Sequence, residues 1–191
     1  MRLLIVTQKV DKDDPVLGFF CGWIQAFAKK VDNIHVIALE VGEYDMPSNV
    51  SVHSLGKKKG SITGILDRIK YAINFYKIIF RLRKEYDIVF VHMNQEYVLL
   101  AGLLWKIFGK KIMLWRNHAK GSFLTSIAVF WCNKVFCTSP SSYTARFKKT
   151  KIMPVGINTD FFKPDVSIRK IPRSILFLGR IAPVKGSINI F

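Results

Sequence analysis

Residues 3–7 have the sequence Leu-Leu-Ile-Val-Thr, residues 8–17 form an aspartate-rich segment that contains Pro15, and a helical pattern extends from about Gly18 to Lys30. The first segment is a short apolar run, which is typical of a strand buried on both faces. A strand, a loop and a helix in this order form the first unit of a parallel α/β sheet. We therefore expect later parts of the chain to repeat this unit.

The same alternation of short apolar runs and longer amphipathic segments continues to about residue 155. Gly109 follows one helical segment, as expected of a residue that ends a helix in the left-handed conformation. Strands are predicted at residues 3–7, 34–39, 50–53, 87–92, 111–116, 134–137 and 151–153, and helices at 18–30, 62–86, 95–108 and 123–131, with a further helix beginning near Ser139 or Pro140. The pattern predicts an α/β fold over residues 1–155: a doubly wound, Rossmann-like parallel sheet with helices on both faces.

A change of pattern after residue 155 indicates a domain boundary. Pro154, Gly156, Pro164 and Pro172 interrupt a stretch without sustained periodicity, so residues 156–173 are predicted to be an interdomain linker. Residues 174–191 contain one apolar run and a glycine-containing loop, which is too little to fold as a domain. We expect them to be the truncated beginning of a second domain, and the natural protein to be roughly twice as long as this chain.

The net charge of +17 on 191 residues indicates attraction to an anionic partner: nucleic acid, acidic lipid head groups or phosphorylated substrates. Charged residues interrupt every apolar run before the roughly 18 residues needed to span a membrane. The short apolar start does not fit a secretory signal, so a cytoplasmic location is expected. Cys21, Cys132 and Cys137 lie within apolar segments, and we interpret them as core residues rather than redox or metal-binding residues.

Two motifs after residue 153 resemble those of a known family. The segment Leu176-Phe-Leu-Gly-Arg-Ile-Ala-Pro-Val-Lys-Gly186 is similar to the opening of the donor domain in family 4 retaining glycosyltransferases, which have the GT-B fold. The segment Pro154-Val-Gly-Ile-Asn-Thr-Asp-Phe-Phe162 resembles the hinge that precedes this opening. The two motifs stand in the family's order and spacing, and the resemblance extends over essentially the whole chain.

The resemblance implies an enzyme that transfers a sugar, with retention, from a nucleotide sugar to a glycan or lipid-linked acceptor, as in the biosynthesis of cell-envelope polysaccharide. Glycosyl transfer releases a diphosphate whose developing charge has to be stabilised. GT-B enzymes use cationic groups for this, so no metal cofactor is expected. Arg180 and Lys185 are the candidate cations, and Gly179 and Gly186 would let the backbone approach the diphosphate. Two solvated loop cations are the alternative interpretation.

Weaker matches to the family lie in the first domain, at the carboxyl ends of predicted strands, where ligands bind in open α/β sheets. The resemblance implies that His118 reaches the reaction centre as a catalytic residue, where an imidazole can donate or relay a proton. The candidates for the acceptor site or the interdomain cleft are Gly18, His92, Asn94 and Asn117. The alternative for His118 is a half-exposed loop histidine without a catalytic role, and the alternative for His92 is a hydrogen bond to a neighbouring loop. The chain departs from the family where Phe19 and Phe20 follow Gly18 and where Asn94 replaces a second histidine.

The sequence Asp11-Lys-Asp13 matches the Asp-x-Asp motif of metal-dependent glycosyltransferases. Two acids in a loop before a proline are also ordinary turn residues. We assign them to a turn, because the surrounding sequence predicts a different fold from the one that carries that metal site.

Basic residues gather between residues 57 and 84, where Asp67 is nearly the only acid. They are Lys57, Lys58, Lys59, Arg68, Lys70, Lys77, Arg81, Arg83 and Lys84. Apolar residues in the same segment recur at helical spacing, so the predicted helix packs one face on the sheet. Each basic residue near an anionic membrane contributes about 1 kcal/mol of attraction. We therefore expect a peripheral association with the cytoplasmic face of a membrane.

A nonenzymatic, basic Rossmann-like module that binds anionic membrane or nucleic acid is the alternative function, since it too would explain the charge. The sequence has no recognisable helix-turn-helix, zinc-finger or RNA-binding aromatic motif, and such a module would leave the two motifs after residue 153 unexplained. We therefore expect no nucleic-acid partner. A single-domain subunit completed by a partner chain is a further alternative.

Overall fold

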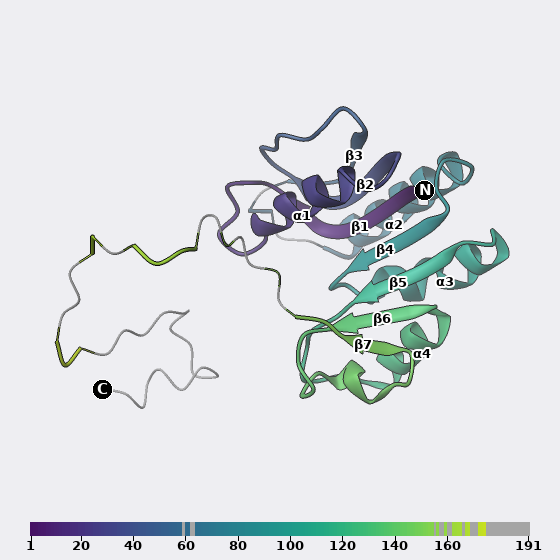
Figure 1. The fold of residues 1–191 in the computed structure, drawn as a ribbon. Coiled ribbons are helices and arrows are strands. Elements are labelled where there is room, and N and C mark those ends of the chain that lie inside the picture. The colour runs from purple at the N-terminus through teal and green to yellow at the C-terminus, as the bar shows by residue number, and fades with distance from the viewer. Residues whose placement is uncertain are drawn as a thin grey trace. The chain divides into compact units, whose positions relative to one another are not determined.

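A computed structural model of the chain describes residues 1–58, 60–61, 64–154, 156, 159, 162–165, 167–168 and 172–174. Contacts divide the chain into two units, Met1–Val155 and Gly156–Phe191. The helices and strands described below belong to the first unit (Figure 1). Residues 175–191, which include Gly179, Arg180, Lys185 and Gly186, lie outside the described residues.

A parallel sheet forms the centre of the first unit. Within the described residues it has seven strands in the order β3-β2-β1-β4-β5-β6-β7 (Figure 1). The strands are β1 (Arg2–Val10), β2 (Asn33–Val41), β3 (Val50–Lys57), β4 (Ile88–His92), β5 (Lys111–Trp115), β6 (Lys134–Cys137) and β7 (Thr150–Ile152). Neighbouring strands are parallel throughout. The predicted α/β fold with a parallel sheet is therefore confirmed.

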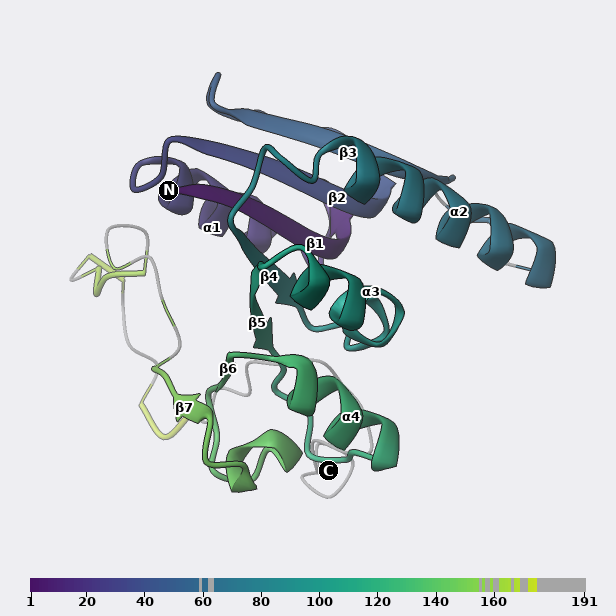
Figure 2. The same cartoon turned by 90° about the vertical axis from the view of Figure 1, so that its right-hand side faces the viewer.

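Helices cover both faces of this sheet, as Figure 2 shows. One face carries α1 (Phe19–Ala28), and the other carries α2 (Ile65–Arg81), α3 (Glu96–Ile107) and α4 (Phe123–Trp131). The chain direction explains this division, because right-handed crossovers that lead toward β3 and those that lead toward β7 place their helices on opposite faces.

Strand β1 contributes to two apolar cores, because successive side chains of a strand point to opposite faces. Leu3 and Ile5 belong to the core under α1, whereas Leu4 and Val6 belong to the core under α2, α3 and α4. All four side chains are buried. This burial on both faces explains why the strand has a continuous apolar run rather than an alternation of polar and apolar residues.

The three cysteines are buried and unpaired, as the sequence predicts. Burial raises the pKa of the Cys132 thiol to about 12. Because thiolate is the reactive form of cysteine, Cys132 behaves as a small apolar residue of the core.

The prediction that a helix begins near Ser139 or Pro140 is wrong. The segment instead forms a single 3₁₀ turn, η1 (Tyr143–Arg146), before β7. The hydroxyl of Ser142 donates a hydrogen bond of 3.2 Å to the carbonyl oxygen of Arg116. Because Arg116 is distant in the sequence, the local apolar pattern does not reveal this contact.

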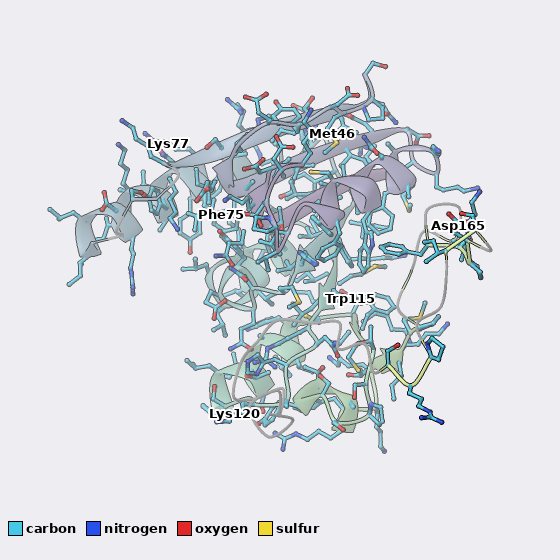
Figure 3. The ribbon with its side chains drawn as sticks, turned by 90° about the vertical axis from the view of Figure 1, so that its left-hand side faces the viewer. Met46, Phe75, Lys77, Trp115, Lys120 and Asp165 are labelled. Atoms are coloured by element: carbon cyan, nitrogen blue, oxygen red, sulfur yellow. The ribbon has the colours of Figure 1, made fainter. Side chains whose placement is uncertain are left out.

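Helix α2 packs on the sheet only through its C-terminal half. Phe75 and Ile79 are fully buried, whereas Ile65 and Leu66 are 78% and 82% exposed. Figure 2 shows α2 extending beyond the neighbouring elements, and Figure 3 shows Lys77 on the outer side of the helix. The predicted packing of one helix face on the sheet is therefore found in the later turns of α2, while its first turns are exposed.

Helices α3 and α4 pack closely at Gly102. A methyl group at this position would lie 2.9 Å from Cβ and Cγ of Trp131, which is closer than the packed atoms of a protein approach. Gly22 in α1 provides a contrast, because it is exposed and a methyl group there would have no neighbouring atom within 4 Å.

Gly22→Ala and Gly102→Ala are expected to change stability in opposite directions. Both place alanine inside a helix, which by itself adds about 0.5–1 kcal/mol to the free energy of unfolding. At residue 102 the added methyl group clashes with Trp131, so the free energy of unfolding should fall by about 1–3 kcal/mol. Urea unfolding measures the difference, and a gain in stability for both variants would contradict the close packing of α3 on α4.

Candidate functional site

A pocket of about 450 Å³, lined mainly by polar and charged residues, opens at the carboxyl ends of β1, β2, β3 and β4. This edge of the sheet contains the point between β1 and β4 where the strand order reverses, and ligands of open α/β sheets bind at such points. We call it the strand-end pocket. Its walls are formed by Gln8, Lys9, Asp14, Val16, Leu17, Glu40, Lys57, His92, Met93 and Asn94.

Lys9 is the centre of an ion-pair network in the pocket wall. Its Nζ lies 2.8 Å from Asp14 Oδ2 and 2.6 Å from Glu40 Oε1, while Lys57 Nζ lies 3.9 Å from Glu40 Oε2. The side chains of Lys9 and Asp14 are each only 14% exposed. Hydrogen bonds to Asp14 and Glu40 raise the pKa of Lys9 above its usual value, and the bond from Lys9 is the main cause that lowers the pKa of Asp14 to about 2. Lys9 and Asp14 are therefore charged near neutral pH.

This network was not predicted from the sequence, because the predicted first strand ended at residue 7. In the structure β1 continues to Val10, and the parallel register places Lys9 beside Glu40 of β2. A charged residue after an apolar run is usually the beginning of a loop. The available signal was a lysine and a glutamate at matching positions of two strands that prove to be neighbours.

The turn before α1 is held by Asp14. Its Oδ1 accepts the backbone N–H groups of Val16 at 2.9 Å and Leu17 at 2.7 Å. Gly18 follows, and a methyl group there would lie 2.6 Å from the carbonyl oxygens of Lys12 and Asp14. Glycine is therefore required for the close turn. Val16 and Leu17 line the pocket, while Gly18 shapes the segment that presents them.

His92, one of the predicted cleft residues, lines the pocket but is only 2% exposed. Its Nδ1 lies 3.2 Å from Thr7 Oγ1, and its ring stacks on Phe20 with 3.8 Å between the ring centroids. Burial lowers the pKa of His92 to about 4. The imidazole is therefore neutral near pH 7 and maintains the shape of the pocket rather than donating a proton to a ligand.

Asn94 reaches the pocket through a tight turn at the end of β4. Its N–H donates a 2.8 Å hydrogen bond to the carbonyl oxygen of His92, and the intervening Met93 has a φ of 68°. A positive φ at a residue other than glycine is uncommon, and a turn of this kind is strained. Strained backbone of this type occurs preferentially at functional sites. The structure thus brings His92 and Asn94 together in one pocket.

His118 lies in a separate loop that follows β5. The loop is held by Arg116, whose Nη2 donates a 2.9 Å hydrogen bond to the carbonyl oxygen of Lys120, and by the N–H of Tyr143, which donates to the carbonyl oxygen of His118 at 3.0 Å. His118 Nδ1 lies 3.1 Å from both the backbone nitrogen and the carbonyl oxygen of Lys120. The imidazole is exposed, and the backbone of residue 120 fixes its Nδ1 edge.

Asn117 connects this loop to the end of β6. Its Oδ1 accepts the N–H of Thr138 at 3.2 Å. Neither Asn117 nor His118 is among the residues that line the strand-end pocket, although their loop follows the strand next to β4. The structure therefore places the predicted first-domain residues in two neighbouring groups at one edge of the sheet. Arg180 and Lys185, the predicted diphosphate ligands, lie outside the described residues.

Asp11 and Asp13 form a turn, as predicted from the sequence. Asp11 Oδ1 accepts the N–H of Asp13 at 3.1 Å, and Asp11 is only 2% exposed. Across the part of the chain that the structure describes, no group of three or more histidine, cysteine, aspartate or glutamate side chains is placed to hold a metal ion.

Residues 14–122 match the model of a protein family described as glycosyl transferase 4-like. The matched region contains Asp14, Glu40 and Asn94 of the strand-end pocket as well as His118. No curated protein sequence matches the chain.

The chain shares its fold with solved structures, among them the following two. The chain matches the apo form of the lipopolysaccharide outer core galactosyltransferase WaaB with a TM-score of 0.53 and 16% sequence identity, over 83% of this chain and 47% of that protein. It matches MurG of Acinetobacter baumannii with a TM-score of 0.54 and 8% identity, over 82% of this chain and 46% of that protein. The chain spans about half the length of these structures. Its fold is that of half a GT-B enzyme.

The stability of the chain is expected to fall between pH 7 and pH 5 because of His92. The ordinary histidine pKa of 6.5 applies in the unfolded chain and a pKa of about 4 in the folded one, so proton uptake favours the unfolded state as the pH falls. This one group contributes a loss of about 2 kcal/mol over that range. Urea unfolding should show a flatter pH dependence for His92→Gln.

His118→Gln is the matched control for this measurement, because it removes an exposed imidazole. It should retain the pH dependence of the unaltered chain. An unchanged slope for His92→Gln would contradict a buried, neutral imidazole at residue 92.

Proposed function

The chain belongs to the glycosyl transferase 4-like family, and from this premise we propose that it forms the acceptor-side half of a retaining glycosyltransferase. The extent of the family match supports the proposal, because residues 14–122 contain most of the strand-end pocket and the loop of His118. The donor is a nucleotide sugar, as in the family. It is bound by a second domain that begins near residue 174 or belongs to a partner chain.

In the proposed reaction an acceptor hydroxyl oxygen forms a bond to the anomeric carbon of the donor sugar. The bond between that carbon and the diphosphate oxygen breaks, the hydroxyl proton passes to the departing diphosphate, and the nucleoside diphosphate leaves. Attack on the face from which the diphosphate departs retains the configuration of the sugar. Arg180 and Lys185 stabilise the diphosphate by fixed positive charge, as the motif resemblance implies, and they take the place of a metal.

The strand-end pocket has the groups that a sugar acceptor requires. Lys9 is a hydrogen-bond donor, Asp14 and Glu40 are acceptors, and the amide of Asn94 is both. Sugar hydroxyl groups also donate and accept, so this mixture suits a polyhydroxyl ligand. His118, in the loop held by Arg116, contacts the transferred sugar or the acceptor near the leaving group.

His118→Ala and Lys185→Ala are each expected to lower the turnover of the full-length enzyme by about 100-fold or more, because each removes a group placed where charge develops. Release of nucleoside diphosphate and transfer of a labelled sugar measure turnover. Lys120→Ala is the control in the same loop, since only the backbone of residue 120 contacts the imidazole of His118. Near-normal turnover of the first two variants would refute their proposed roles.

We also propose that the basic surface around α2 attaches the enzyme to the cytoplasmic face of an anionic membrane. The exposed basic residues are Lys58, Arg68, Lys70, Lys77, Arg81, Arg83 and Lys84. The acid of this helix, Asp67, accepts a hydrogen bond from the N–H of Gly64, and Lys59 lies outside the described residues. Each basic residue near the lipid head groups adds about 1 kcal/mol of attraction. None of the described helices combines the length and apolarity needed to cross a membrane.

The double variant Lys70→Glu with Lys77→Glu is expected to weaken membrane binding by about tenfold or more, because it reverses two charges near the bilayer. Flotation with phosphatidylcholine vesicles that contain phosphatidylserine measures this effect. Lys29→Glu with Lys30→Glu, exposed beside α1 on the other face of the sheet, is the matched control and should bind normally. Binding that depends on neither acidic lipid nor salt would exclude this attachment.

A further inference from the structure

A second hollow, of about 490 Å³, lies between α2 and α3 next to β2 and β3. The accessible part of its apolar wall is formed by Leu39, Tyr71, Ala72 and Leu100, and the buried side chains of Leu55, Phe75 and Tyr97 lie beneath them. We call this hollow the α2–α3 groove. Burial raises the pKa of Tyr97 to about 12, so its hydroxyl stays neutral and adds no charge to the wall.

The groove adjoins the strand-end pocket at Asn94, which lines both. On one side of Asn94 the wall carries the charged network centred on Lys9, and on the other side it is largely apolar. The charged residues of the groove are Arg68 and Glu96, which lie near the N-termini of α2 and α3. A single ligand that fits both hollows therefore has a polar head and a hydrocarbon tail.

A row of exposed apolar side chains borders the groove along α2. Ile65, Ile69 and Ile73 are 78%, 51% and 49% exposed, and their spacing of four residues places them on one stripe of the helix. Arg68 and Ala72 of the groove occupy the adjacent stripe. Single exposed apolar residues are ordinary, but a continuous apolar surface marks a site of interaction. The groove thus opens onto a surface that favours contact with hydrocarbon.

We propose that the α2–α3 groove binds the hydrocarbon chain of a lipid-linked sugar acceptor, whose sugar occupies the strand-end pocket. This inference rests on the proposed glycosyltransferase function and narrows its acceptor to sugars carried on a lipid. Lys70 and Lys77 face the lipid head groups beside the exposed row. The hydrocarbon chain of the acceptor therefore passes from the groove along α2 into the bilayer. A free glycan would contact the strand-end pocket alone.

The dependence of binding on chain length tests this proposal. Glucose, n-hexyl β-D-glucoside and n-octyl β-D-glucoside, used below the critical micelle concentration, share one head and differ in the tail. Each methylene removed from water strengthens binding about fourfold, so the octyl compound should bind on the order of tenfold more tightly than the hexyl compound. In an NMR titration its addition should shift the amide signals of Ala72 and Tyr97. Equal affinity for all three compounds, or no shift in the groove, would overturn the proposal.

Leu100→Glu and Leu103→Glu form a matched pair of variants on α3. Both leucines are exposed, by 44% and 56%, so neither substitution disturbs the core, but of the two only Leu100 lines the groove. A carboxylate at residue 100 would lose water on contact with hydrocarbon, so Leu100→Glu should weaken n-octyl β-D-glucoside binding by about tenfold or more. Leu103→Glu should bind normally. Ala72→Phe, which fills the groove from α2, should reproduce the loss, and full affinity in both groove variants would place the tail elsewhere.

The experiments distinguish an error in the groove proposal from an error in the proposed glycosyltransferase function. Sugar transfer to glucose and to n-octyl β-D-glucoside with equal KM would support the proposed function and contradict binding of a hydrocarbon chain in the groove. The opposite outcome is that the octyl compound binds in the groove but no nucleotide sugar is consumed with any acceptor. It would support the groove as a hydrocarbon site and contradict the proposed function. A dimer in sedimentation velocity that Leu100→Glu abolishes would show that a second copy of the chain covers the groove, which would also overturn the proposal.

Discussion

Parallel hydrogen bonding between β1 and its two neighbours positions the loops at the edge of the sheet that carries the candidate site. The register of β1 with β2 and with β4 brings together Lys9, Glu40 and His92, which are distant in the sequence. Because β1 is buried on both faces, a shift of one residue would exchange the side chains under α1 with those under the other three helices. The strand therefore has one acceptable register, and that register fixes the pocket.

The fold could be predicted because its elements follow from local periodicity. Helix α4 and strand β6 occupy the predicted residues, and Gly109 has the expected positive φ of 69° at a helix end. The errors arise where a distant partner overrides the local pattern. Lys9 lies in a strand beside Glu40 of β2, and the hydroxyl of Ser142 binds the carbonyl oxygen of Arg116. Such partners are known only when the chain is folded.

The location of the candidate site could be predicted from strand ends, but its chemistry depends on surroundings that residue types do not reveal. Asn94 and His92 both line the pocket, yet stacking on Phe20 and burial make His92 a neutral structural residue. The environment of an ionisable group, and not its identity, decides its charge. Arg180 and Lys185 depend on the motif alone and stay predictions.

The ion-pair network in the wall of the strand-end pocket has no net formal charge, although the chain as a whole is strongly basic. Lys9 and Lys57 carry two formal positive charges, and Asp14 and Glu40 carry two negative ones, so the network sums to zero on a chain of net charge +17. A nucleoside diphosphate, as a polyanion, gains little from a locally neutral concavity and is drawn to the basic surfaces around it. An uncharged sugar has no such preference and is selected by short-range contacts. In the proposed reaction, this cancellation of charge at Lys9 would keep the anionic nucleotide sugar and its nucleoside diphosphate product away from the place of an uncharged acceptor.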